Sequence, residues 1–183
     1  MIHQALLRRV VVGREAALVD FVETVAPLLL LRFVSVPALG GSGRVQGLLD
    51  PCLPEGVQSI APEAFKRFSQ MHDQSMLTHT LNGIFAAMRL MEKLPASKAL
   101  DDLEQRLWLM GYVCHDYTKV YGVKVHADNL PLIRKLITCL GDSLNFTDFC
   151  APWHEYLDDI VFLAQNTQTV EGANLNLRDF SAC

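Results

Sequence analysis

The chain has 183 residues, of which 50% are hydrophobic and 20% are charged, so it is long enough for one folded domain and too apolar to be intrinsically disordered. Its net charge of -4 excludes a general electrostatic attraction to nucleic acids or anionic membranes. A nucleic-acid substrate would therefore need a local basic strip or a partner subunit. The five cysteines have no CxxC spacing, which favours free thiols in a reducing cytoplasm over a disulfide framework.

The N-terminal third predicts a helical segment followed by a linker. Within residues 1–34 apolar side chains recur at roughly helical spacing, and Gly13 and Pro27 are expected to break or bend the helix. The longest apolar run, residues 25–31, is shorter than the roughly 20 residues that cross a bilayer. No signal peptide is indicated. Residues 35–62 are rich in Gly and Pro, which indicates a linker.

From Ala61 onward the apolar spacing predicts helices almost throughout. Pro62 is expected to start the first of them, because proline is favoured in a first helical turn. Asp73 is expected to cap the second helix, which continues to about Leu94 and is ended by Pro95.

Three further helices follow from capping residues and apolar stripes. Ser97 is expected to cap the third helix, and Asp128 or Asn129 to open the fourth. Gly141 is expected to end the fourth helix, and Pro152 to begin the fifth.

The expected architecture is all-α, because no stretch alternates convincingly between apolar and polar residues. It has three parts: an N-terminal helical segment, a Gly/Pro-rich N-terminal linker, and a main helical domain at residues 63–183. We expect these parts to form one compact domain.

Two segments carry residues that can bind a divalent metal ion. His79 lies in a predicted helix that carries Asn82 and Gly83 one turn later and Ala86 and Ala87 two turns later. The small residues among these would let another helix approach closely. His115 and Asp116 follow directly after an apolar helical run, and a carboxylate beside the interior is costly unless a cation compensates it. Imidazole and carboxylate are ordinary ligands of divalent ions, so we expect His79, His115 and Asp116 to converge on one ion.

Each of these residues also has a structural alternative. His79 could be a core histidine that hydrogen-bonds to a carbonyl group. Asp116 could cap the short segment 117–121, or form an ion pair with Lys119.

Other histidines and acids are further candidates for metal ligands. His72 precedes Asp73, and the helix-capping role of that aspartate explains the pair without a second ion. His126 lies in a predicted loop. His154 lies in the first turn of the last predicted helix, and Asp158 lies one turn later on the same face. These two side chains could share a cation or only hydrogen-bond.

Lys119 lies three residues after Asp116, where its charge could meet a phosphate beside the ion. A divalent ion lowers the pKa of bound water and neutralises charge on a phosphoryl oxygen, and two ions about 4 Å apart would stabilise both the entering and the leaving oxygen. The pattern therefore predicts metal-assisted hydrolysis of a phosphate ester, with His115, Asp116 and Lys119 as catalytic residues. A lysine that is simply solvated is the alternative.

A helix histidine followed by a second helix ending in His-Asp-x-x-Lys resembles the HD superfamily of metal-dependent phosphohydrolases. The strings at residues 73–83, 159–168 and 171–176 are similar to the N-terminal HD nuclease domain of the large subunit of subtype I-D CRISPR effector complexes. The resemblance covers about residues 60–180.

The resemblance implies an HD-domain helical bundle, one or two divalent ions (Mn, Ni, Co, Mg or Fe), and cleavage of DNA, with preference for single strands. It implies CRISPR effector subunits with a guide RNA and a separate helicase as partners, in the cytoplasm and away from membranes. In that family a much larger polymerase-like region follows the HD domain, so the resemblance implies an excised domain or a stand-alone piece.

Residue by residue, His79 matches the first histidine of the family, and His115 and Asp116 match the His-Asp pair. His154 matches a later histidine that serves a second ion. The family's final aspartate has no clear counterpart, and an asparagine in its place would remove one charged ligand. The candidates for that position are Asp158, Asp159 and Asn166.

Two other functions remain open on the sequence. An HD phosphohydrolase of a nucleotide or another small phosphate ester would have a pocket closed over its ligand, whereas a nuclease would have an open basic groove. A non-catalytic helical docking module with a decayed metal site would bind no ion. The candidates for lining a basic groove are Lys119, Lys124, Arg134 and Lys135.

Overall fold

The computed structural model describes residues 16–39, 74–91, 100–123 and 125–172. Most of these residues are helical, and the strands within them are only two and three residues long. The prediction of an all-α fold is therefore confirmed. Among the described helices, none combines the length and the apolar character needed to cross a membrane.

The described part of the N-terminal helical segment contains the helices α2 (Ala16–Thr24) and α3 (Ala26–Phe33). The break falls at Val25, and Pro27 lies in the first turn of α3, where its missing N–H costs no helical hydrogen bond. The predicted interruption near this proline is confirmed, and Gly13 lies outside the described residues. Both helices bury one apolar face against the rest of the molecule.

The predicted linker contains a strand that the sequence analysis did not expect. Strand β1 (Pro37–Leu39) pairs antiparallel with β2 (Gln74–Ser75), and the N–H of Met76 donates to the carbonyl of Val36 at 2.7 Å. These strands are too short to show alternation, and their partners lie far apart in the sequence. The pairing joins the N-terminal segment to the start of the next helix.

Helix α5 (Met76–Met91) starts later than the cap predicted at Asp73, which lies outside the described residues. Ser75 takes the capping role, because its Oγ accepts the Thr78 N–H at 3.2 Å. One apolar face of the helix is buried at Leu77, Ile84 and Met88, with Leu81 half-buried. The predicted end of this helix at Leu94 and Pro95 lies outside the described residues.

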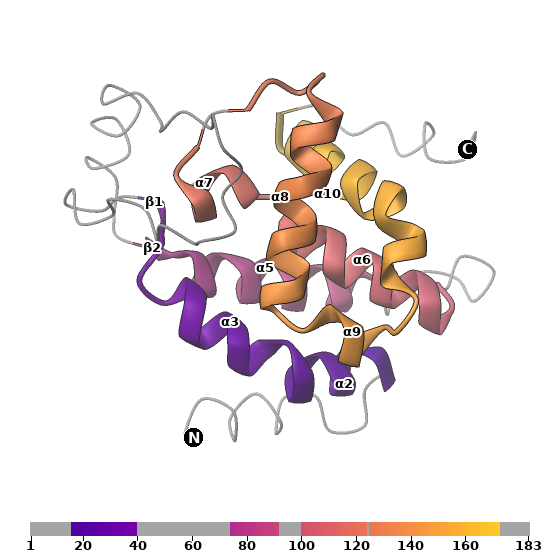
Figure 1. Ribbon diagram of the computed structural model, residues 1–183. Coiled ribbons are helices and arrows are strands. Elements are labelled where there is room, and N and C mark those ends of the chain that lie inside the picture. Colours follow the sequence, from indigo (N-terminus) through magenta and orange to yellow (C-terminus); the bar gives the residue numbers. More distant parts are fainter. Residues whose placement is uncertain (1–15, 40–73, 92–99, 124, 173–183) are drawn as a thin grey trace.

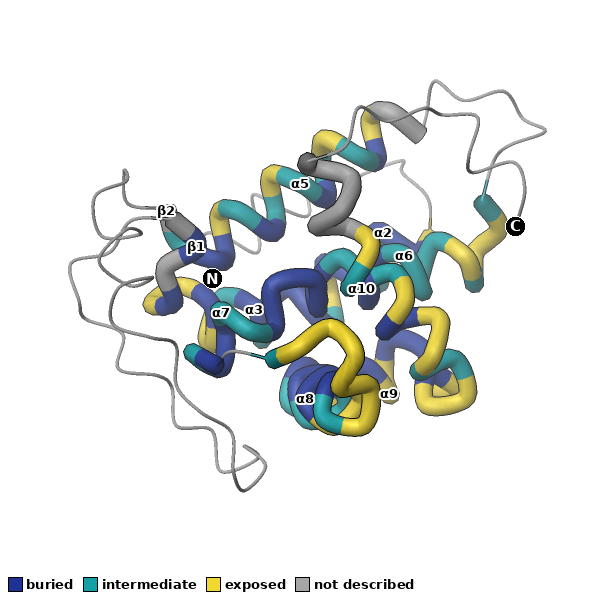
Figure 2. Tube along the Cα trace, turned by 90° about the horizontal axis from the view of Figure 1, so that it is seen from above, coloured by how far each residue is buried: buried dark blue, intermediate teal, exposed yellow. Residues whose placement is uncertain are grey.

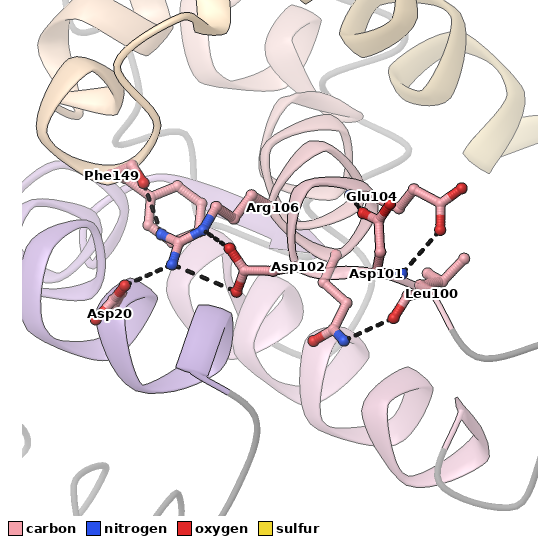
Figure 3. A network of polar contacts seen from close by, with 8 residues as sticks. Asp20, Leu100, Asp101, Asp102, Glu104, Arg106 and Phe149 are labelled. Carbon is pink, nitrogen blue, oxygen red and sulfur yellow. Dashed lines mark hydrogen bonds and ion pairs between the residues drawn. The ribbon is translucent and has the colours of Figure 1, made fainter. Parts of the chain in front are cut away.

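Helix α6 (Asp102–Cys114) begins with a capping box that the sequence analysis missed. Asp101, rather than the predicted Ser97, is the N-cap: its carboxylate accepts the Glu104 N–H at 2.8 Å, and Glu104 accepts the Asp101 N–H at 2.8 Å (Figure 3). The box satisfies two backbone donors at once. Ser97 lies outside the described residues.

The guanidinium of Arg106 ties α6 to two other elements (Figure 3). It donates to Asp102 on its own helix at 2.7 Å, to Asp20 on α2 at 2.6 Å, and to the carbonyl of Phe149 at 2.7 Å. Phe149 ends the short helix α9 (Phe146–Phe149). Burial by itself would lower the pKa of Arg106, but the hydrogen bonds that it donates to the two carboxylates outweigh that effect and raise the pKa.

The C-terminal half contains helices α7 (Tyr117–Tyr121), α8 (Leu130–Ser143) and α10 (Leu157–Gly172). Asn129 caps α8, as predicted, because its side chain accepts the Leu132 N–H at 3.3 Å.

The predicted end of the fourth helix is wrong, whereas helical structure does begin directly after Pro152. Helix α8 continues two residues past Gly141, and a Cβ at that glycine would lie 2.6 Å from the ring of Trp153. Gly141 therefore serves close packing instead of ending the helix. The helix expected from Pro152 starts as the 3-10 helix η2 (Trp153–Tyr156), which leads into α10.

Helix α6 lies at the centre of the bundle. It contacts α2, α5, α8 and α10, and α10 runs along it most extensively (Figure 1). Along α5, buried, intermediate and exposed residues alternate (Figure 2), as expected for a helix that covers the bundle with one face. Because α5 and α6 contact each other, the C-terminal end of α6 and the first turn of α5 belong to the same packed core.

We predict that Arg106→Ala lowers the free energy of unfolding by about 1–3 kcal/mol, because it removes a charged donor that serves three acceptors. The two carboxylates are 49% and 58% exposed, so solvent screening limits the loss. Urea unfolding monitored by circular dichroism measures the effect.

The matched control is Arg134→Ala, which removes the ion pair between Arg134 and Asp158. Their side chains are 48% and 68% exposed, so this variant should change stability by no more than about 0.5 kcal/mol. Equal stability of the two variants would contradict a bridging role for Arg106.

Candidate metal centre

The candidate site forms where the end of one helix meets the beginning of another. His79 lies in the first turn of α5, while His115 is the C-cap of α6 and Asp116 is the N-cap of α7. Both His115 and Asp116 are buried, as the apolar run before them predicted. The C-terminal end of α6 carries a partial negative charge, which favours a cation at this position.

Three donor atoms converge at this point. The Nε2 atoms of His79 and His115 lie 3.1 Å apart, and each lies 3.3 Å from Oδ2 of Asp116. Two ligands that each lie about 2.1 Å from one ion, at an angle of about 100°, are about 3.2 Å apart. The spacing and the chemistry of the donors therefore fit a divalent transition-metal ion. Among the described residues, these three form the cluster able to hold one.

The orientation of His115 is set by the helix that carries it. Its Nδ1 hydrogen-bonds to the carbonyl oxygen of Tyr112, one turn earlier on α6. A neutral imidazole that donates through Nδ1 keeps a lone pair on Nε2, the form in which it binds a metal. The ring of Tyr112 also packs against that of His115, with centroids 4.7 Å apart. Tyr112 belongs to the apolar run before His115, and that pattern does not predict its contacts with the imidazole.

Asp116 is held in its anionic form. Burial by itself would raise its pKa, but the neighbouring imidazoles of His115 and His79, and after them the ammonium group of Lys119, outweigh that effect and keep the pKa well below its usual range. The ionised carboxylate gives this cluster a negative charge beside its two imidazole nitrogens, which favours a cation there.

Lys119 pairs directly with this carboxylate. Its Nζ lies 2.8 Å from Oδ2 of Asp116, and its side chain is 25% exposed. Of the two alternatives for Asp116, the ion pair is present, and no side-chain hydrogen bond caps α7. Lys119 therefore stands at the border between the buried donors and solvent.

The approach of α5 to α6 depends on Gly83. A Cβ at this position would lie 1.6 Å from the hydroxyl oxygen of Tyr112. His79 lies one turn before Gly83 on the same face of α5, and His115 lies one turn after Tyr112 on α6. The close contact predicted from the small residues of α5 is therefore confirmed at Gly83, and it brings the two imidazoles together.

The other predicted ligands lie elsewhere in the described structure. His154 is exposed, and its Nε2 is 3.7 Å from Asp142 of α8. His126 pairs with Asp128 at 3.3 Å, and both are largely exposed. His72 lies outside the described residues.

The candidates for a final acidic ligand on α10 also do not reach the cluster. Asp158 pairs with Arg134 at 2.7 Å, Asp159 is exposed, and the side-chain amide of Asn166 donates to the carbonyl of Phe162 at 2.8 Å. The inner face of α10 is apolar, since its buried residues include Ile160 and Ala164. This face serves packing against α6.

Two of the residues that were candidates for lining a basic groove form ion pairs with acidic residues. Arg134 is engaged by Asp158 and Lys119 by Asp116, while Lys135 is exposed on α8. Lys124 lies outside the described residues.

No protein-family model, no curated protein and no solved structure matches this chain.

We predict that Gly83→Ala weakens binding of Mn²⁺ by about tenfold or more, because α5 and Tyr112 must move apart by more than the ligand geometry tolerates. Isothermal titration calorimetry measures the affinity, and urea unfolding measures the accompanying loss of stability.

The matched control is Gly141→Ala, whose Cβ would lie 2.6 Å from the ring of Trp153, away from the cluster. This variant should lose stability in the same range and keep the affinity of the parent protein. An equal loss of affinity in both variants, or in neither, would show that the Gly83 contact does not set the donor geometry.

Proposed function

We propose that this chain is a metal-dependent phosphohydrolase of the HD type. The observation that supports the proposal is the convergence of His79, His115 and Asp116, which come from different helices and place two nitrogens and one oxygen within 3.3 Å of one another. A core histidine pair with no ligand function would not need a buried carboxylate, whose desolvation is costly.

Each residue of the site would have a separate role in the reaction. When bound, a divalent ion supplies Lewis acidity, which activates water at neutral pH and neutralises charge on a phosphoryl oxygen. His79, His115 and Asp116 would hold it, and the carbonyl of Tyr112 would keep the ring of His115 in the orientation that presents Nε2. Lys119, at the solvent border, would turn its ammonium group to a phosphate oxygen of the substrate.

We further propose that the substrate is DNA, preferably single-stranded, and that the chain acts as the HD nuclease of a type I-D CRISPR interference complex. The support is the resemblance of residues 73–83 and 159–168, which include much of the first half of α5 and of α10. Because the chain has a net charge of -4, a DNA strand would be held largely by the partner subunits, the guide RNA and the helicase.

We predict that the double variant His115→Ala, Asp116→Ala abolishes Mn²⁺-dependent cleavage of a fluorescent single-stranded DNA, because it removes two of the three donors and the only charged one. Cleavage should fall to the level that EDTA leaves in the parent protein. Parallel assays with duplex DNA and with a mixture of deoxynucleoside triphosphates compare the substrate classes.

The control variant is His126→Ala, which removes an exposed histidine paired with Asp128 outside the cluster and should leave cleavage unchanged. Circular dichroism checks that the helices remain folded. Cleavage by the double variant at the parental rate would refute the nuclease assignment, faster hydrolysis of nucleotides than of DNA would favour a small-molecule phosphohydrolase, and failure of the parent protein to bind Mn²⁺ would leave a docking module.

A further inference from the structure

The oxygen atom that would bind the metal already has a cationic partner from its own chain. Oδ2 of Asp116 is the atom that lies 3.3 Å from each imidazole and 2.8 Å from Nζ of Lys119. The oxygen that would bind the metal is therefore the same atom that accepts the ion pair from Lys119.

The position of Lys119 is fixed by the backbone of α7. Its N–H donates to the carbonyl of Asp116 at 2.8 Å, so the two residues share the first turn. Gly122 then ends the helix with φ of 63°, and its N–H donates to the carbonyl of Lys119 at 3.2 Å. Left-handed backbone is inexpensive for glycine. The short helix α7 thus places the side chain of Lys119 beside the carboxylate of Asp116.

Burial explains why such a cation is needed without a metal. Asp116 is 2% exposed, and a buried carboxylate without a compensating charge is strongly destabilising. Both imidazoles lie beside it, but a neutral imidazole brings no net charge, whereas an ammonium group carries a full positive charge at neutral pH. Lys119 meets the electrostatic requirement that the metal would otherwise meet.

The same arrangement opposes the metal. A divalent ion bound by the three donors would add two positive charges close to the ammonium of Lys119, and like charges a few ångströms apart repel by about 1 kcal/mol or more even in water. Lys119 and His79 are the partly exposed members of this group, at 25% and 21%, while His115 and Asp116 are each at 2%. An ion that enters from solvent therefore meets the lysine at the mouth of the site.

We propose that Lys119 is the built-in counter-cation of the metal-free site and that it competes with the divalent ion for Asp116. This inference rests on the proposed function, because it assumes that the three donors bind an ion. Lys119 then has a positioning role. It compensates the charge of the Asp116 carboxylate in the metal-free protein, and it lowers the affinity of the site for the divalent ion.

The test compares the parent protein with Lys119→Met, which removes the charge at similar length. In EDTA, the variant should unfold several degrees below the parent, because Asp116 loses its compensating charge. In calorimetric titration it should bind Mn²⁺ at least about tenfold more tightly, since the repulsion is gone. Lys119→Gln, which keeps a hydrogen-bond donor without the charge, should bind more tightly as well and covers the case in which the methionine variant does not fold.

Lys135→Met is the matched control, because Lys135 is exposed on α8 and should change neither quantity. Unchanged or weaker Mn²⁺ binding by the Lys119 variants, with binding by the parent intact, would overturn the counter-cation role and leave the proposed function standing. Absence of Mn²⁺ binding by the parent protein would overturn the proposed function and this inference together.

Discussion

The contact between Gly83 of α5 and Tyr112 of α6 is the constraint on which the candidate site depends. A side chain at position 83 would occupy the space of the tyrosine hydroxyl. With that space open, His79 and His115 face each other across the same helix crossing, and their Nε2 atoms come within 3.1 Å. If α5 and α6 lay farther apart by the diameter of a methyl group, the two imidazole rings would no longer be in contact.

The rest of the fold holds α6 so that this crossing is reproducible. At its N-terminal end the capping box of Asp101 and Glu104 satisfies the backbone of the first turn, and the guanidinium of Arg106 fixes the helix to α2 and α9. Along its length it packs against α10, where a Cβ at Gly111 would lie 2.5 Å from that of Leu163. Because α6 is anchored at its N-terminal end and packed along one side, His115 and Asp116 at its other end have little freedom to move.

Much of this arrangement could be predicted from the sequence, and the exceptions have physical causes. An apolar run before His115 and Asp116 indicates burial, because backbone geometry carries the next side chains into the same interior. Helix ends are harder, since Asp101 and Ser97 are both good capping residues; the cap at Asp101 is completed by Glu104 three residues later. Gly141 has the composition of a helix end, but its neighbour in space, Trp153, cannot be inferred from the local sequence.

The two kinds of histidine in the chain differ in what their surroundings require. His126 and His154 lie beside exposed carboxylates, and such pairs contribute about 0–1 kcal/mol, so solvent replaces either partner at little cost. Their presence needs no ligand. At Asp116 solvent is excluded, and every positive group around the carboxylate must come from the chain or from a bound ion. The cluster at Asp116 and the surface pairs have similar residues, and they differ in the burial of one carboxylate. Only the buried carboxylate requires a cation, and the spacing of residues in the sequence does not show which carboxylate is buried.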